Sequence, residues 1–160
     1  MMETYQKNTG IVVFNKDKKV LMFRRVDGEN SDIWQFPQGK IEKGEAFLEG
    51  GLRELEEETG ITSVKVVSFI DKPLQYDFPP DVIDSFKKMG RTDIGKHQYW
   101  VLVYFYGNED EIAPLKVEHV ELGDFEWVTF DQPVKRAWKP KKEVYEKIMQ
   151  KFSPLIENFE

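Results

Sequence analysis

The stretch Gly39–Ile61, GKIEKGEAFLEGGLRELEEETGI, decides how the rest of the chain is interpreted. It predicts a helix over Ala46–Thr59, because acidic residues lie near its start and Gly60 follows its end, where a left-handed backbone is common. Apolar residues recur at helical spacing and predict the buried stripe of this helix: Phe47, Leu48, Leu52 and Leu55.

The same helix carries a strong excess of negative charge. Six glutamates and a single arginine lie between Glu45 and Glu58, and Glu54, Glu57 and Glu58 share a face on which like charges repel. Carboxylate oxygens select a hard cation such as Mg²⁺. The alternative is a glutamate-rich face that simply lies in water. The lack of a pairing lysine, and the Gly50–Gly51 pair that indicates close approach to another backbone, argue against it.

The spacing of these residues resembles a known family motif. The Nudix box, GX5EX7REUXEEXGU, is reproduced at every defined position by Gly39, Glu45, Arg53-Glu54-Leu55, Glu57-Glu58, Gly60 and Ile61. The resemblance implies a Nudix hydrolase, which cleaves nucleoside diphosphates linked to another group with Mg²⁺, or alternatively Mn²⁺, bound by the box glutamates. It also implies an α/β fold, an α/β/α sandwich with a mixed central sheet.

Further residues outside the box gain a role from the resemblance. Glu121 lies six residues before Trp127, the spacing at which this branch places a fourth glutamate, and Glu118 is the competing position. The implied metal ligands are therefore Glu54, Glu57, Glu58, Glu121 and the carbonyl of Gly39, whose backbone we expect to adopt a conformation that other residues resist.

The catalytic roles follow from the same resemblance. The general base stays open between Glu57, Glu54 and Glu121, because Nudix branches differ on this point. Arg53 is expected to orient the box through Glu45 without itself touching substrate.

Segments on both sides of the box resemble one branch of the family. The segment WQFPQG, residues 34–39, is similar to bacterial RNA 5′-pyrophosphohydrolases and plant-type dinucleoside tetraphosphate (asymmetrical) hydrolases. Tyr76-Asp77 with Pro79 resembles a YD-x-P element of that branch. The segment GKHQYW, residues 95–100, resembles its G-x-K-Q-K-W pattern, but His97 and Tyr99 replace lysines. We expect this to remove two cations that face the substrate. The substrate-binding candidates are Arg25, Lys40, Tyr76, Lys96 and Trp138.

The remaining elements are predicted from local patterns. The expected strands are Thr9–Asn15 and Val20–Val26 as a hairpin, a strand in Ile33–Lys40 that Pro37 ends, Val64–Ile70, Gln98–Gly107 as the central strand and Asp124–Phe130. Gln75–Pro80 and residues 90–98 are expected to be loops, and Asp81–Met89 and Lys141–Phe152 to be helices.

The whole chain limits the classes of function. Its 160 residues suit one domain, expected over residues 1–160 with a core at about 8–152. It lacks a long apolar run, a signal-like start and cysteine, so we expect a cytoplasmic protein that is not bound to a membrane. The net charge of −6 makes duplex DNA a poor partner. Both a monomer and a homodimer remain open.

The expected function is a metal-dependent pyrophosphohydrolase. Its substrate is either the 5′-triphosphate end of RNA or a dinucleoside polyphosphate such as diadenosine tetraphosphate. The alternative is a catalytically weak sensor that binds a nucleotide through the same fold, and the intact glutamates argue against it.

Overall fold

The computed structural model describes residues 2–26 and 32–160. The strands are β1 (Thr4–Phe14), β2 (Val20–Arg25), β3 (Trp34–Gln35), β4 (Gln38–Lys40), β5 (Val64–Asp77), β6 (Asp93–Phe105) and β7 (Leu122–Val128). The helices are α1 (Phe47–Thr59), α2 (Pro80–Lys88), α3 (Gln132–Arg136) and α4 (Lys142–Glu157), with short 3₁₀ turns η2 (Glu109–Glu111) and η3 (Lys139–Lys141). No helix in the described ranges is long and apolar enough to cross a membrane.

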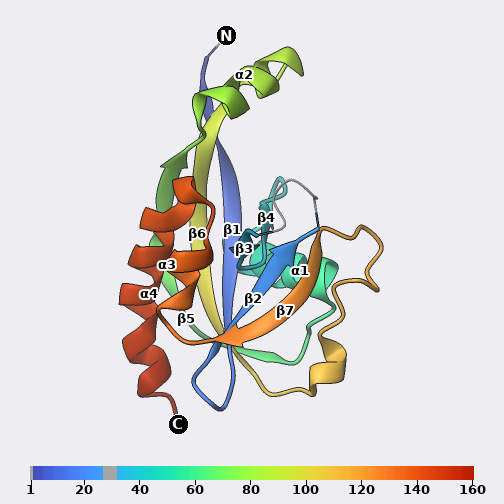
Figure 1. The fold of residues 1–160 in the computed structure, drawn as a ribbon, viewed down its shortest axis with the longest axis vertical. Helices are drawn as coiled ribbons and strands as arrows, with labels where there is room; N and C mark the ends of the chain where they lie inside the picture. The colour runs from blue at the N-terminus through green and yellow to red at the C-terminus, as the bar shows by residue number, and fades with distance from the viewer. Residues whose placement is uncertain (1, 27–31) are drawn as a thin grey trace.

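The described strands form one mixed sheet of seven strands. Its main order is β3-β2-β1-β6-β5, with β4 paired to β1 and β7 paired to β2. β1 and β6 run parallel, while the other pairs are antiparallel. Helix α1 covers one face and α3 and α4 cover the other (Figure 1). The predicted α/β/α architecture is therefore confirmed.

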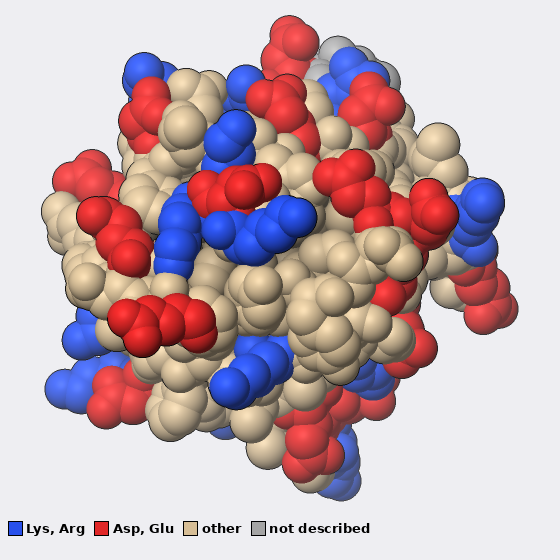
Figure 2. Space-filling model, turned by 90° about the horizontal axis from the view of Figure 1, so that it is seen from below, with Lys and Arg blue, Asp and Glu red and all other residues tan. Residues whose placement is uncertain are grey.

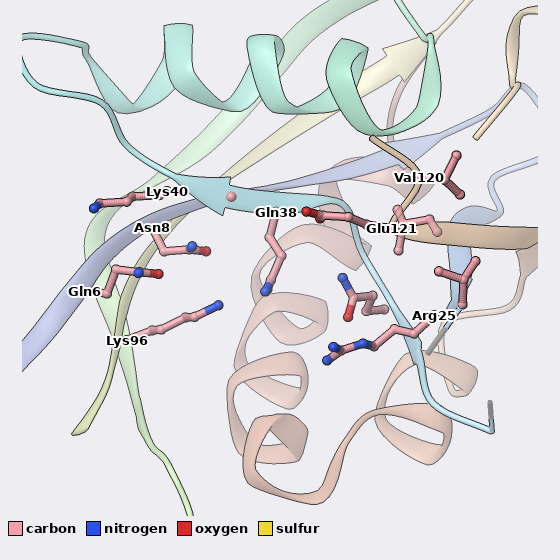
Figure 3. Close-up of a pocket in the computed structure, with 12 residues that line it drawn as sticks. Gln6, Asn8, Arg25, Gln38, Lys40, Lys96, Val120 and Glu121 are labelled. Atoms are coloured by element: carbon pink, nitrogen blue, oxygen red, sulfur yellow. The ribbon is translucent and has the colours of Figure 1, made fainter. Parts of the chain in front are cut away.

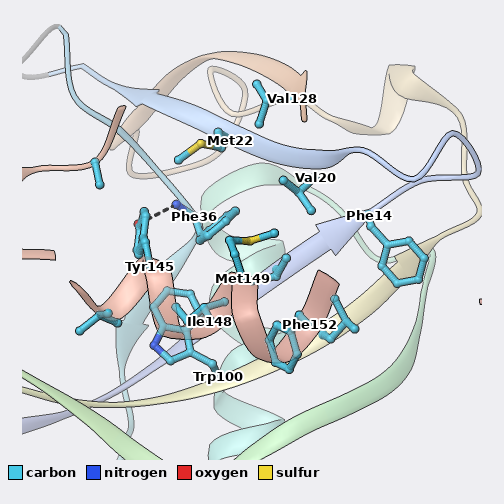
Figure 4. Close-up of a cluster of buried hydrophobic side chains, with 14 of the residues drawn as sticks. Phe14, Val20, Met22, Phe36, Trp100, Val128, Tyr145, Ile148, Met149 and Phe152 are labelled. Carbon is cyan, nitrogen blue, oxygen red and sulfur yellow. Dashed lines mark hydrogen bonds between the residues drawn. The ribbon is translucent and has the colours of Figure 1, made fainter. Parts of the chain in front are cut away.

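The hydrophobicity of β1 explains its central place. Its residues from Asn8 to Phe14 are all buried, and successive side chains point to opposite faces. Val12 and Phe14 join the cluster beneath α4, whereas Ile11 and Val13 join the cluster beneath α1. In the first cluster, the Phe36 backbone N–H donates to the Tyr145 hydroxyl at 3.0 Å, which ties α4 to the chain just before β4 (Figure 4).

Helix α1 ends at Thr59 as the sequence predicts and starts one residue later than predicted, at Phe47, and its glycine pair lets it approach β1. Gly60 has φ 82°, and its N–H donates to the Glu56 carbonyl to close the helix. A Cβ at Gly51 would lie 3.1 Å from Thr9 Oγ1 and 3.3 Å from Ile11 Cγ1. The close neighbours at this position are therefore side chains of β1, and the expectation of a facing backbone is wrong.

Two predicted loops belong to strands. Gln75–Asp77 is the end of β5, and residues 93–98 begin β6, because these segments pair with each other. The register of β5 against β6 shifts between Ile70 and Leu74, and this irregularity accommodates Pro73 inside the strand. The two strands and β1 extend beyond the helical layers, and α2 lies at their far end (Figure 1).

The other differences concern element boundaries. Pro37 separates β3 from β4, which divides Ile33–Lys40 into two short strands that pair with β2 and β1. Helix α4 continues beyond Phe152 through Pro154 to Glu157.

The close packing of β1 on β6 gives a stability prediction. A Cβ at Gly10 would lie 2.4 Å from the Trp100 ring, which is fully buried. We expect Gly10→Ala to lower the free energy of unfolding by about 1–3 kcal/mol, because an overfilled core must shift. Urea denaturation measures this difference, with Lys7→Ala on the exposed side of the same strand as the control. Equal midpoints for the two variants would contradict the packing.

Candidate functional site

Helix α1 turns Glu54 toward the backbone of β4. A Cβ at Gly39 would lie 1.9 Å from the carboxyl carbon of Glu54, so only glycine leaves room for this carboxylate. Gly39 is not among the glycines with positive φ, which are Gly44, Gly60 and Gly90. The sequence-based reason for Gly39 was therefore wrong: the position requires space and not an unusual backbone conformation.

Glu58 is the most deeply buried carboxylate of the box. Glu58 is only 4% exposed, and its Oε1 accepts a hydrogen bond from the Gln38 backbone N–H at 3.0 Å. The other oxygen, Oε2, has no partner among the described residues. Burial raises the pKa of Glu58 well above its usual range, and the charges of Glu121 and Glu54 add to the effect. The structure thus holds one carboxylate oxygen available for a cation.

Glu121 lies beside these two box residues. Its charge contributes to raising the pKa of both Glu54 and Glu58, although burial is the largest cause in each case. Its backbone carbonyl accepts from the Val26 N–H at 3.2 Å, which anchors the segment just before β7. Glu118 is 91% exposed, and its ion-pair contact within the described residues is His119 at 3.9 Å. The geometry therefore favours Glu121 over Glu118 as the fourth carboxylate.

Arg53 connects the acidic residues of the box. Its Nε lies 2.8 Å from Glu45 Oε2, and its Nη1 lies 2.9 Å from Glu54 Oε1 and 3.0 Å from Glu57 Oε2. Its Nη2 also donates to the Lys40 carbonyl at 3.0 Å, which ties α1 to the end of β4. The Arg53 guanidinium, with help from the Glu42 N–H, lowers the pKa of Glu45 to about 2.

The predicted carboxylates share one cavity of about 540 Å³. Glu57 is exposed, at 56%, and within the described residues it pairs with Arg53. The cavity is lined by Glu54, Glu56, Glu57, Glu58, Val117, Glu118, His119 and Glu121.

The donor set of this cavity fits a hard divalent cation. The Glu58 oxygen without a partner, the Glu54 carboxylate against Gly39 and the nearby Glu121 supply oxygen ligands. No three of the described Asp, Glu or His side chains already form a closed metal-binding group. Arg53 instead bonds to Glu54 and Glu57, so these two carboxylates would have to turn toward a cation as it binds.

A second cavity, of about 460 Å³, begins at Glu121 and carries positive charge (Figure 3). Arg25, Lys40 and Lys96 line it together with Gln38 and Glu121. Burial, followed by the charge of Arg25, lowers the pKa of Lys96 to about 8. The cavity therefore places cationic and amide groups directly beside the carboxylates.

A third cavity, of about 500 Å³, continues from the second and is partly aromatic. It shares Arg25, Gln38 and Lys96 with the cationic cavity. Tyr76 and Trp138 meet edge to face, with ring centroids 6.3 Å apart. Its other lining residues are Gln6, Ile33, Phe78, Asp81, Val82, Phe86, Arg91 and Lys141. Its size suits a small-molecule group such as a nucleoside.

His97 and Tyr99 lie away from these cavities. The His97 ring stacks on Tyr5 at 4.5 Å, and Tyr99 stacks on Phe47 of α1 at 4.9 Å. Successive residues of a strand face opposite sides, so Lys96 points to the cationic cavity while His97 and Tyr99 point to the α1 face. The expectation that their change from lysine removes substrate-facing cations is therefore wrong for these cavities.

Sequence reasoning missed two polar residues of the site. Gln38 was interpreted only as part of a branch marker, and Lys141 only as the first residue of a packing helix. Lys141 is 3% exposed, and its Nζ donates to Gln38 Oε1 at 2.9 Å. Burial, followed by the nearby charges of Lys96 and Arg25, lowers its pKa well below the usual range. A buried lysine leaves no local signal in a sequence, since lysines at helix starts are mostly exposed.

Comparison with known proteins gives consistent matches along nearly the whole chain. Residues 4–148 match the NUDIX domain family. Nudix hydrolase 26, chloroplastic, of Arabidopsis thaliana is 37% identical over 154 residues, which cover 94% of this chain and 70% of the relative. An RNA pyrophosphohydrolase of Pelagibacter ubique is 32% identical over 151 residues, covering 94% and 93%.

Solved structures agree on the fold. The E. coli dihydroneopterin triphosphate pyrophosphohydrolase has a TM-score of 0.65 at 17% identity, covering 93% of this chain and 99% of that one. A C. elegans Ap4A hydrolase has a TM-score of 0.62 at 16% identity, covering 92% and 98%. With the box residues gathered at the acidic cavity and these matches in sequence and fold, the chain belongs to the Nudix hydrolase family.

Proposed function

We propose that this protein is a metal-dependent pyrophosphohydrolase of nucleoside polyphosphates. One observation carries the proposal: an acidic cavity and a cationic cavity share Glu121 as a common wall. A polyphosphate bound with divalent cations presents both signs of charge, so it matches this arrangement. The names of relatives that match this chain almost end to end, including RNA pyrophosphohydrolases, support the same reaction.

The acidic cavity is proposed to hold Mg²⁺, with Mn²⁺ as an alternative. The ligands would be Glu54, Glu57, Glu58, Glu121 and the Gly39 carbonyl. When bound, the cations would lower the pKa of an attacking water and neutralise charge on the phosphate oxygens.

The protein residues would then position the reactants. Arg53 holds Glu45, Glu54 and Glu57 through hydrogen bonds, so its role is to orient the carboxylates. The proton acceptor is one of Glu57, Glu54 and Glu121, and Glu57 is the most accessible to solvent among the box carboxylates.

The substrate is proposed to lie across the two remaining cavities. Arg25, Lys40 and Lys96 would bind the phosphate chain, and a nucleoside would occupy the aromatic cavity against Tyr76 and Trp138. The net charge of −6 and the interspersed acidic and basic side chains of the face in Figure 2 give little attraction to a long polyanion. Recognition would therefore concentrate on the nucleotide end.

Two substrate classes fit this description, namely a 5′-triphosphorylated RNA end and a dinucleoside polyphosphate. The positions of His97 and Tyr99 away from the cavities remove one argument against RNA. The overall acidic charge still favours the smaller substrate.

A direct comparison of substrates tests the proposal. With Mg²⁺, we expect kcat/KM above about 10⁴ M⁻¹ s⁻¹ for a short 5′-triphosphorylated RNA, for diadenosine tetraphosphate or for both, because this is the normal range for enzymes on their own substrates. Product analysis of both reactions, with matched samples containing EDTA as the control, measures it. Weak turnover of both substrates would overturn the proposal.

The metal-binding role of the carboxylates can be tested at Glu57. We expect Glu57→Gln to lower kcat by at least about 100-fold with little loss of stability, because the side chain is exposed but its charge is needed by the cations. Steady-state kinetics and thermal unfolding measure the two effects, with the exposed Glu49→Gln in the first turn of the same helix, away from the acidic cavity, as the control. Near-normal kcat in Glu57→Gln would contradict the assignment.

Gly39 offers an independent test of the geometry. Gly39→Ala should displace the Glu54 carboxylate, which is a flexible side-chain end, and we expect kcat to fall by about 10- to 100-fold while the fold persists. Mn²⁺ affinity, measured by electron paramagnetic resonance, should weaken in parallel. Unchanged Mn²⁺ affinity together with unchanged kcat would show that the contact between Gly39 and Glu54 does not matter.

A further inference from the structure

We propose that the side-chain amide of Gln38 binds the phosphate chain, and that Lys141 is a positioning residue that orients this amide. The inference deepens the proposed function and rests on it. The Nudix box does not account for a chain of hydrogen bonds around the Gln38 side chain. Gln38 Oε1 accepts from Lys141 Nζ at 2.9 Å and from Gln98 Nε2 at 2.8 Å.

The contacts of the Gln38 oxygen decide where its nitrogen points. An amide oxygen has two lone pairs, and both are used by Lys141 and Gln98. The NH₂ group must therefore point away from these two residues. Figure 3 shows the nitrogen end of Gln38 in the cavity, between Asn8 and Lys96 on one side and Arg25 on the other. Gln38 lines both the cationic and the aromatic cavity.

The Gln98 side chain is itself held in place by a neighbouring strand. Its Nε2 also donates to Asn8 Oδ1 at 2.9 Å, and Gln98 is fully buried between β1 and β5. The direction of the Gln38 amide is thus fixed from two sides, by a strand of the sheet and by the start of α4. A donor that is oriented before binding loses little entropy when a phosphate oxygen arrives.

The burial of Lys141 needs a reason beyond stability. An apolar side chain of similar length would avoid the cost of removing an ammonium group from water. Lys141 instead lies near Lys96 and Arg25, whose positive charges repel its ammonium group. As an ammonium group Lys141 can only donate, which has one consequence that an apolar residue lacks: the Gln38 oxygen must face it, and the Gln38 NH₂ must face the cavity.

The backbone of the same residue reaches the acidic cavity. The Gln38 N–H donates to Glu58 Oε1 at 3.0 Å, so Gln38 stands between a candidate metal ligand and the cationic groups. Its amide is therefore placed for the phosphate nearest the carboxylates, where cleavage is proposed.

Binding of inorganic tripolyphosphate to the full chain in EDTA, measured by calorimetry, tests the inference without turnover. Gln38→Glu keeps an acceptor for Lys141 but replaces the donor that faces the cavity, and we expect affinity to fall about 10- to 100-fold. Lys141→Met, Gln38→Met and the double variant complete a cycle, with Lys139→Met on the exposed neighbour as the control for lost charge. Lys141→Met should fold, because apolar replacement of a buried charge is commonly tolerated.

The cycle separates a positioning role from direct contact. In the protein that keeps Gln38, we expect Lys141→Met to weaken tripolyphosphate binding severalfold more than Lys139→Met does. In the protein that carries Gln38→Met, we expect Lys141→Met to have no such extra effect. In kinetics, Gln38→Glu and Lys141→Met should raise KM more than they lower kcat. Equal effects of Lys141→Met in both backgrounds, or wild-type affinity in Gln38→Glu, would overturn the inference. A wild-type protein that binds tripolyphosphate in this pattern yet hydrolyses neither nucleotide substrate would overturn only the proposed function.

Discussion

The hydrogen bond from the Gln38 backbone to Glu58 is the contact on which the site depends. It holds the last turn of α1 against β4 and leaves the second oxygen of a deeply buried carboxylate without a protein partner. Burying a charged carboxylate without a partner for one oxygen costs free energy, and the pKa of Glu58 rises as a result. The surrounding structure maintains this arrangement through Arg53, which bonds both to the acids of α1 and to the Lys40 carbonyl at the end of β4.

One cluster of acidic side chains and one cluster of basic side chains lie close together without neutralising each other. Glu54, Glu58 and Glu121 repel one another on one side of Gln38, while the half-buried Lys96 and the buried Lys141 lie on the other. Each group alone reduces stability, because desolvation and like charges act in the same direction. Under the proposed function, a divalent cation bound with a polyphosphate would relieve the repulsion within both clusters at once. The free energy of unfolding that the unliganded protein loses through this repulsion would then be recovered as binding free energy.

The sequence predicted those parts of the site that local spacing controls. The glutamates of α1 and its end at Gly60 follow from residues within one helix, and the contact between Arg53 and Glu45 agrees with what the resemblance to the Nudix box implies. Prediction from the sequence failed where pairing between distant strands determines the local structure. The residues at 93–98 have a loop-like composition, yet they form a strand because β1 and β5 flank them. The buried Lys141 was missed for the same reason, since its environment comes from distant segments.

Strand alternation also limits what the family pattern can say about the substrate. In β6, Lys96 and Gln98 face the cavities and the buried amide network, whereas His97 and Tyr99 face Tyr5 and α1. A lysine side chain at position 97 or 99 would leave the strand on the α1 face of the sheet, opposite the cavities. Under the proposed function, discrimination between an RNA end and a dinucleoside polyphosphate would then come from residues that line the cavities. A phosphate chain and one nucleoside are common to both substrates, so under the proposed function selectivity would have to arise where the two differ: in the RNA chain beyond the first nucleoside, or in the second nucleoside beyond the phosphates.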